Sequence, residues 1–316
     1  MNRAGDVRAD VEAYLAARRA MGVMLGTAGR QLRRFARWAD ARGHRGPLTT
    51  ELVVHWAQDT PTVTRVGTAR RLNCVRTFAR WLIAIKPRTE VPPAGILGPS
   101  YERKPPHVLT EREVSTLMRS AAQLRPRGGL RPQTLRTIIG LLASTGLRPQ
   151  EALSLDRGDV DLDAGHLVVR ETKFHKSRLV PIHETTRRAL RSYARRRDLA
   201  VARPRVRLFF LFEDGTGVTS HKFKWAFRQI RRALPARLVG RALRPYDLRH
   251  TFACRRLLTW HEDRGDVQAA LPALSTYLGH ACVTNTYWYL TGVPELFAAC
   301  GERFEKFASS MQEARR

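Results

Sequence analysis

Acidic residues and lysine are both scarce in this chain of 316 residues. Asp and Glu total 28 against 56 Lys and Arg, which gives a net charge of +28, and only seven of the basic residues are lysine. Such an excess destabilises a compact chain by self-repulsion unless a polyanion neutralises it. Nucleic acid is the usual partner of a protein this basic. The guanidinium fork of arginine also suits phosphate contacts, although genomic base composition would explain the preference for arginine equally well.

Long apolar runs and paired cysteines are also missing. No segment approaches the roughly 20 apolar residues that a membrane span needs, and the start, MNRAGDVRAD, lacks the apolar stretch of a secretory signal. We therefore expect a cytoplasmic protein, associated with the nucleoid and not with a membrane. The cysteines form no CxxC pair, so we expect reduced thiols and no metal site. They are Cys74, Cys254, Cys282 and Cys300.

Hydrophobic residues make up 43% of the chain, enough for two domains with real cores. In the first 85 residues, apolar side chains recur at helical spacing in four segments. An arginine-rich polar face is ordinary for one solvated helix, but four such faces in one bundle favour a surface that grips DNA. We place this N-terminal helical domain at residues 1–88. The four expected helices span about 6–21, 27–41, 50–59 and 64–85.

Residues 86–107 carry six prolines and two glycines, so no regular element can run through them, and we expect a linker at 89–107. The second domain, 108–316, opens with a capping box at Thr110 and Glu113. Two strands, near 166–171 and 177–183, flank a tight turn, and the other patterns are helical. The expected fold class is therefore mainly α with a small β-sheet. The later expected helices lie near 220–233, 246–260, 267–278, 283–290 and 294–312.

Three stretches carry residues that can act on a phosphodiester. TGLRPQE holds Arg148 between a glycine turn and a helix start, PYDLRH contains Arg249, and LGHACVTNTYWYL places His280 nine residues before Tyr289. Cleavage without a metal needs a nucleophile, cations on the non-bridging oxygens, an acid for the leaving oxygen and a group that places the nucleophile. Taken singly, Arg148 could be an ordinary surface arginine and the tyrosine could be aromatic core packing.

Together these stretches resemble the signature boxes of the tyrosine recombinase, or phage integrase, family. The boxes occur in the family's order, and the two-domain plan extends the resemblance over the whole chain. The resemblance implies an N-terminal core-binding domain and an α+β catalytic domain. It further implies a site-specific DNA recombinase, from a setting such as a mobile element, that works through a 3′-phosphotyrosyl intermediate and needs no cofactor. Such enzymes act on double-stranded DNA as tetramers of like or mixed protomers on two sites.

The resemblance also implies roles for residues. Arg148 and Arg249 would clamp the phosphate, with Glu151 orienting them, while His280 would contact the phosphate and Tyr289 would attack it. Two further roles are assigned to residues from their position beside a matching motif. His250 follows Arg249 as in many relatives and would play a supporting part. The lysine of the hairpin turn TKFHK before RLVP would be the general acid, and this places it at Lys173 in preference to Lys176.

Two tyrosines need separate comment. Tyr287 lies two residues before Tyr289, about 200° around a helix, so both cannot face one phosphate. Tyr246 stands where the family more often has histidine. Because a phenol is a poor base at neutral pH, we predict that Tyr246 donates a hydrogen bond to the phosphate. The alternative is that it only packs at a helix start after Pro245.

Two other functions stay open. A type IB topoisomerase shares this chemistry and would relax supercoils without forming recombinants. A catalytically silent DNA-binding relative would act only in assembly and would form no covalent complex. For the recombinase, the expected helix 294–312 would dock on a neighbouring protomer. Its apolar residues are Leu296, Phe297, Phe304 and Phe307.

Overall fold

The computed structural model describes residues 6–60, 63–101, 107–170, 177–235, 243–263, 267–280 and 282–291. The chain divides into two compact units, residues 1–104 and 105–316, and each has a hydrophobic core of its own. The fold is mainly α-helical with one small sheet, as the sequence predicted. None of the helices described is long and apolar enough to cross a membrane.

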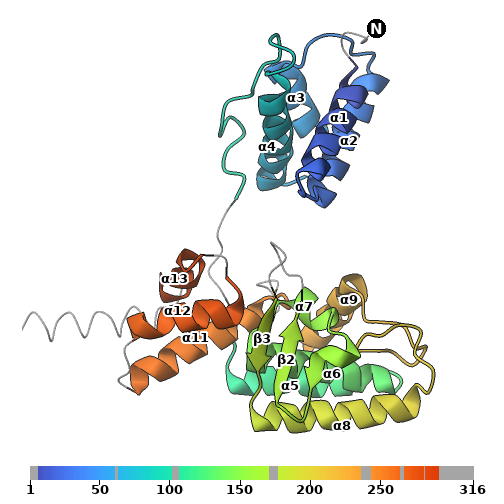
Figure 1. Cartoon of the computed structure of the whole chain (residues 1–316), viewed down its shortest axis with the longest axis vertical. Helices are drawn as coiled ribbons and strands as arrows, with labels where there is room; N and C mark the ends of the chain where they lie inside the picture. Colours follow the sequence, from blue (N-terminus) through green and yellow to red (C-terminus); the bar gives the residue numbers. More distant parts are fainter. Residues whose placement is uncertain are drawn as a thin grey trace, which may run out of the picture. The chain divides into compact units, whose positions relative to one another are not determined.

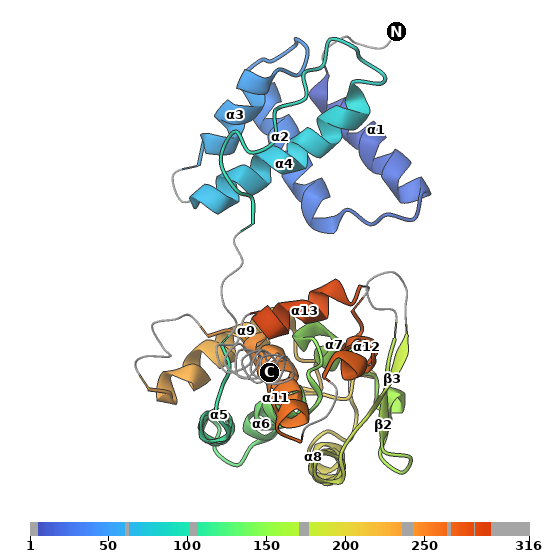
Figure 2. The same ribbon diagram turned by 90° about the vertical axis from the view of Figure 1, so that its left-hand side faces the viewer.

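The first unit is a bundle of four helices (Figure 1, Figure 2). They are α1 (Val7–Ala20), α2 (Gly26–Ala41), α3 (Thr50–Gln58) and α4 (Arg65–Leu82). Side-chain oxygens of Asp6, Thr49 and Thr64 cap the first turns of α1, α3 and α4, because these turns have amide groups with no partner inside the helix. The aromatic pair of Phe35 and Trp56, with ring centroids 5.2 Å apart, lies in its core.

The proline-rich segment after α4 lies along this bundle. Arg76 Nε donates to the carbonyl of Pro92 over 2.7 Å, Arg70 Nε donates to that of Ser100 over 2.8 Å, and the Glu90 carboxylate accepts from the Thr50 amide over 2.8 Å. Proline prevents a helix here, so the carbonyl groups find arginine partners on α4 instead. The described part of the expected linker, 89–101, therefore belongs to the first unit.

The second unit is built around three neighbouring helices (Figure 1). Helix α6 (Leu130–Thr145) packs between α5 (Glu111–Ala122) and α8 (Glu184–Ala200), and α11 (Asp247–Glu262) packs against it as well. The capping box at Thr110 and Glu113 is present at the start of α5. The remaining described helices are α7 (Pro149–Leu153), α9 (Ser220–Ile230), α12 (Val267–Leu278) and α13 (Thr284–Thr291), with 3-10 turns at Arg157–Asp159 and Arg231–Ala233.

The sheet is antiparallel, with strand order β1-β2-β3. The predicted hairpin is present but shorter than expected, with β2 (His166–Val169) paired to β3 (Arg178–Pro181) so that Leu167 faces Val180. The sequence did not predict β1 (Val160–Asp161), because two residues are too few to show alternation. Residues 209–212 are buried as expected, and the segment is held by isolated bridges at Leu208 and Leu211, with a bend between them, and not in a strand of the sheet.

Candidate active site

A left-handed glycine sets the position of Arg148. Gly146 ends α6 with φ of 61°, and a Cβ at this position would collide with the ring of Phe252. Only glycine fits both conditions. The chain then turns at once into α7, with Pro149 in the first helical position, where its missing N–H has no cost. Arg148 is consequently the N-cap residue of α7, fixed by backbone on both sides.

A second left-handed glycine sets the position of His280. Helix α12 ends at Leu278, and Gly279 follows with φ of 70°. The His280 amide donates back to the carbonyl of Ser275 over 2.9 Å, the closing bond of a Schellman turn. The imidazole Nδ1 of His280 lies 2.8 Å from the hydroxyl oxygen of Thr286 in α13. His280 is therefore fixed to α12 through its backbone and to α13 through its side chain.

Three consecutive carbonyl groups at the end of α12 each accept a hydrogen bond from a different arginine. The pairs are Tyr277 with Arg178 (2.9 Å), Leu278 with Arg249 (2.8 Å) and Gly279 with Arg148 (2.8 Å). The last carbonyls of a helix lack partners within it and form the negative end of its dipole. This helix end therefore gathers guanidinium groups from the start of α7, from β3 and from α11.

Glu151 is the carboxylate shared within this cluster. Its oxygens accept hydrogen bonds from Arg148 at 2.5 Å and from Arg178 at 2.8 Å, and its side chain is only 8% exposed. Burial acts to raise the pKa of Glu151, but the hydrogen bond and charge of Arg178, followed by the contacts with Arg148, outweigh burial and hold the pKa below its ordinary value. The carboxylate is therefore ionised and balances one arginine only.

Arg249 is completely buried, which is rare for arginine. Besides the bond to Leu278, its Nη1 donates to the carbonyl of Gly146 over 2.8 Å. Its Nε–H has no acceptor among the described residues. Burial lowers the pKa of Arg249, while the nearby hydroxyls of Tyr246 and Tyr289 act in the opposite direction. A buried guanidinium group with an unpaired N–H donor can bind an anion.

Tyr289 and Tyr287 take opposite positions on α13. Tyr289 is 2% exposed and its ring stacks on that of His280, with centroids 6.1 Å apart, while Tyr287 is 48% exposed. Burial raises the pKa of Tyr289, whereas the charge of Arg249 and a hydrogen bond from it act to lower it. The ring also packs against the apolar cluster of α11 and α12. Of the two tyrosines, only Tyr289 lies with the arginine cluster.

Both histidines of the site are neutral at pH 7. Burial lowers the pKa of His280 to about 3, and the charges of Arg249, Arg148 and Arg178 add to this effect. Burial likewise lowers the pKa of His250 to about 4. The His250 ring lies between those of Tyr246 and Tyr289, at centroid distances of 5.0 and 5.5 Å. Tyr246 itself is 37% exposed and directly precedes α11.

Three expectations lie outside the described residues: Lys173, its alternative Lys176, and the helix at 294–312. Arg178 lies in the RLVP strand but was not predicted as a site residue, because its role depends on contacts between β3, α7 and α12 that no local pattern contains. In the described part of the chain, no three His, Cys, Asp or Glu residues gather as metal ligands would.

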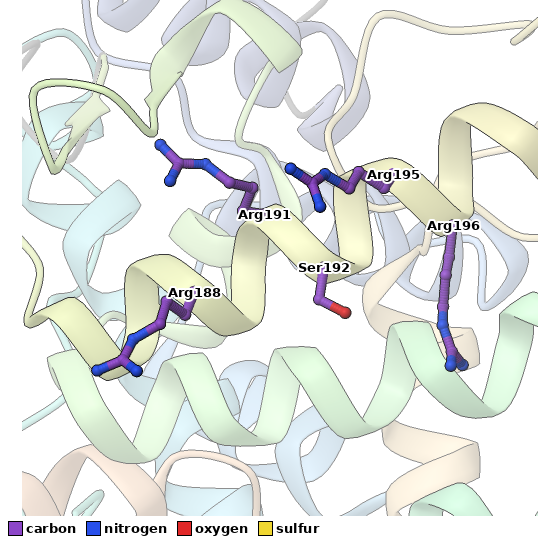
Figure 3. Close-up of a pocket in the computed structure, with 5 residues that line it drawn as sticks. All are labelled: Arg188, Arg191, Ser192, Arg195 and Arg196. Carbon is purple, nitrogen blue, oxygen red and sulfur yellow. The ribbon is translucent and has the colours of Figure 1, made fainter.

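A second arginine-rich region lies on α8, on the other side of the second unit from α7 and α13 (Figure 1, Figure 2). It borders a shallow hollow of about 380 Å³. Figure 3 shows Arg191 and Arg195 on one side of α8 and Arg188 and Arg196 on the other, with Ser192 between the last two. They do not converge on one ligand, so we assign no site here. The arginines are Arg188, Arg191, Arg195 and Arg196.

Comparison with known proteins identifies the family. The model of the phage integrase family matches residues 107–293. The chain belongs to this family. A Sinorhizobium fredii protein named integrase/recombinase y4rE is 39% identical over 93% of this chain and 94% of its own length. The tyrosine recombinase XerD of Bradyrhizobium diazoefficiens is 30% identical over 75% of each chain. This chain is accordingly a tyrosine-type site-specific recombinase.

Solved structures show the same fold. Two structures of the Tn1549 transposon integrase, in complex with a circular intermediate DNA and with transposon right end DNA, give TM-scores of 0.66 and 0.67. They cover 93% and 95% of this recombinase and 99% of their own chains, at 17% and 15% identity. The recombinase fold is therefore retained although few residues are shared.

Proposed function

We propose that this recombinase cuts and rejoins duplex DNA by attack of Tyr289 on a phosphate held by Arg148 and Arg249. The observation that carries the proposal is the completely buried Arg249, which has an unpaired Nε–H donor and lies against the Tyr289 hydroxyl. Glu151 balances only one of the three arginines of the cluster. The remaining positive charge suits a phosphate whose negative charge grows in the transition state.

The reaction transfers a phosphate and returns it. The phenol of Tyr289 gives up its proton to water, to a neighbouring base or to the phosphate itself, and its oxygen bonds to phosphorus. The bond to the 5′ oxygen breaks, and the products are a 3′-phosphotyrosyl protein and a free 5′ hydroxyl. A 5′ hydroxyl of a partner duplex then reverses the step, so the ester conserves the bond energy. Lys173 would give the leaving oxygen its proton. Neutral His280 can donate a hydrogen bond to the phosphate, and Tyr246 can donate a second one.

Duplex DNA would be bound by both units, which we take to be the core-binding and catalytic domains. Helix α9 supports this in the second unit. Its outer face exposes Lys222, Lys224, Trp225 and Arg228, and its first residue, Ser220, donates a hydrogen bond to Gln150 of α7, beside the arginine cluster. Residues 102–107 would join the units. Four protomers would assemble on two sites at the nucleoid, with residues 294–312 contacting a neighbour.

Trapping the covalent intermediate tests the proposal. A site selected by the protein from a randomised duplex pool is made into a nicked suicide substrate, and the adduct is followed on denaturing gels. Tyr289→Phe should abolish the adduct while Tyr287→Phe, two residues away on the exposed face of α13, should retain it. An adduct mapped to Tyr287 or Tyr246 would contradict the assignment. Relaxation of supercoils without recombinant products would instead indicate a topoisomerase. If the wild type forms no adduct, the protein is a catalytically silent relative.

A further inference from the structure

Arg178 belongs to the arginine cluster, yet the family resemblance gave it no role. We propose that Arg178 is a positioning residue of the active site. By sharing the carboxylate of Glu151, it keeps Arg148 in place and leaves the charge of Arg148 available to the scissile phosphate. The inference deepens the proposed function and depends on it.

Both oxygens of Glu151 are engaged by both arginines. Arg178 Nη2 lies 2.8 Å from Oε2 and its Nη1 3.2 Å from Oε1, while Arg148 Nη1 lies 2.5 Å from Oε1 and its backbone amide 3.0 Å from Oε2. Arg178 therefore meets the carboxylate as a two-pronged fork, the stronger geometry for such a pair. Arg148 makes one side-chain bond to Glu151 and one to the carbonyl of Gly279, and keeps further N–H groups for a phosphate.

The balance of charge requires a second arginine here. If Glu151 paired with Arg148 alone, the two would form a closed ion pair without net charge, and a phosphate would gain little from approaching it. Arg178 is the main influence that keeps the pKa of Glu151 low against the opposing effect of burial, ahead of Arg148. Arg178, 12% exposed, meets both oxygens of Glu151, and Arg148 is 28% exposed, so the two arginines share the carboxylate and Arg148 does not pair with it alone.

Arg178 is held firmly enough to act as a positioning group. Its Nε donates to the carbonyl of Tyr277 over 2.9 Å, and its guanidinium group fills the space beside Gly279, where an added Cβ would lie 2.7 Å from Nη1. It is also the first residue of β3, paired with Val169 of β2, and the sequence places Lys173 between these two strands. The Arg178 side chain therefore connects the β2–β3 hairpin to Glu151 of α7 and to the end of α12, which directly precedes Gly279 and His280.

A double-mutant cycle separates positioning from a purely structural role. Arg178→Met, Arg178→Lys, Glu151→Gln and the Glu151→Gln/Arg178→Met pair are compared with the wild type. Arg191→Met is the matched control, because Arg191 ties α8 to the sheet through the Leu162 carbonyl and Asp163 yet lies away from the cluster. Each protein is measured for its thermal midpoint, for its dissociation constant on the selected duplex, and for its single-turnover cleavage rate on the suicide substrate.

The proposal predicts a specific pattern. Arg178→Met should slow cleavage by about 10–100-fold, as expected when a catalytic group is displaced, while binding changes little. Adding Glu151→Gln should recover about tenfold of this loss, because the unbalanced carboxylate that captures Arg148 is gone. Arg178→Lys, which keeps the charge without the fork, should fall between. Arg191→Met should cleave at the wild-type rate.

Three results would overturn the inference. One is wild-type cleavage by Arg178→Met. Another is a loss of cleavage in proportion to losses of binding and thermal midpoint, as in a variant that is merely unstable; Arg178→Lys decides this case if Arg178→Met does not fold. A third is a double variant slower than Arg178→Met, with no rescue. If the wild type forms the adduct and any of these results is found, only the role of Arg178 is refuted. If the wild type forms no adduct, the proposed function and the role of Arg178 are both refuted.

Discussion

At the scale of single residues, Tyr246 is the point at which this recombinase departs from its family's usual histidine. It is partly exposed, and its ring makes a T-shaped contact with that of His250. Removing the hydroxyl in Tyr246→Phe should slow suicide-substrate cleavage by the equivalent of about 1–3 kcal/mol, the usual value of a hydrogen bond to a charged group. Tyr246→His should retain much of the activity. A Phe variant that cleaves at the wild-type rate would leave Tyr246 as a packing residue.

His250 makes the folded protein sensitive to acid. Burial lowers its pKa from 6.5 to about 4, with a further lowering by Arg244 and Arg249 that Asp247 partly opposes. Between these values the unfolded chain binds a proton that the folded chain refuses. The free energy of unfolding should therefore fall as pH falls from about 6.5 to 4, by up to about 1.4 kcal/mol per pH unit.

Denaturant titrations of the DNA-free protein from pH 7 to pH 4 measure this dependence. His250→Asn should make the curve less steep in that window, where His280, with its pKa lowered to about 3, still contributes. His221→Asn, on the exposed face of α9, should leave the curve as in the wild type. Equal pH dependence in the wild type and in His250→Asn would show that His250 is protonated in the folded state at these pH values.

At the scale of elements, the turn between α6 and α7 depends on glycine for two reasons. Gly146→Ala would put a side chain at φ of 61° and against the Phe252 ring. The left-handed conformation alone costs about 1–2 kcal/mol, and the collision adds to it. Gly165→Ala is the matched control in the same unit, since φ is 74° there but the nearest atom, Arg187 Cδ, lies at an ordinary 3.7 Å. Equilibrium unfolding should show a clearly larger loss for Gly146→Ala than for Gly165→Ala.

The elements differ in how far their sequence predicts them. The helices of the first unit were predictable because each carries its own apolar stripe, and α1, α3 and α4 also begin with a side-chain cap, such as Thr64 at the start of α4. The two-residue strand β1 was not, because its only distinguishing feature is its pairing with β2. In the candidate site, motif spacing identified Arg148, Arg249 and His280. The sharing of Glu151 by Arg178 depends on contacts between β3, α7 and α12, which no local pattern contains.

At the scale of the whole molecule, the proline-rich segment 86–101 shows that composition does not predict which unit a segment packs against. Its prolines correctly exclude a helix, yet the backbone carbonyls of Pro92 and Ser100 are bound by arginines of α4. Only residues 102–106 between the two units are outside the description. The segment whose composition suggested a linker therefore belongs in large part to the first unit.

The net charge of +28 predicts that DNA binding depends strongly on salt concentration. If both units contact the duplex, several phosphates are neutralised and their counterions are released. The logarithm of the binding constant should then fall linearly with the logarithm of salt concentration, with a slope near −0.9 per phosphate and at least about six phosphates per protomer. Fluorescence anisotropy on the selected duplex between low and moderate salt measures the slope. A slope near −2 or shallower would place most of this charge, including the divergent arginines of α8, away from the DNA.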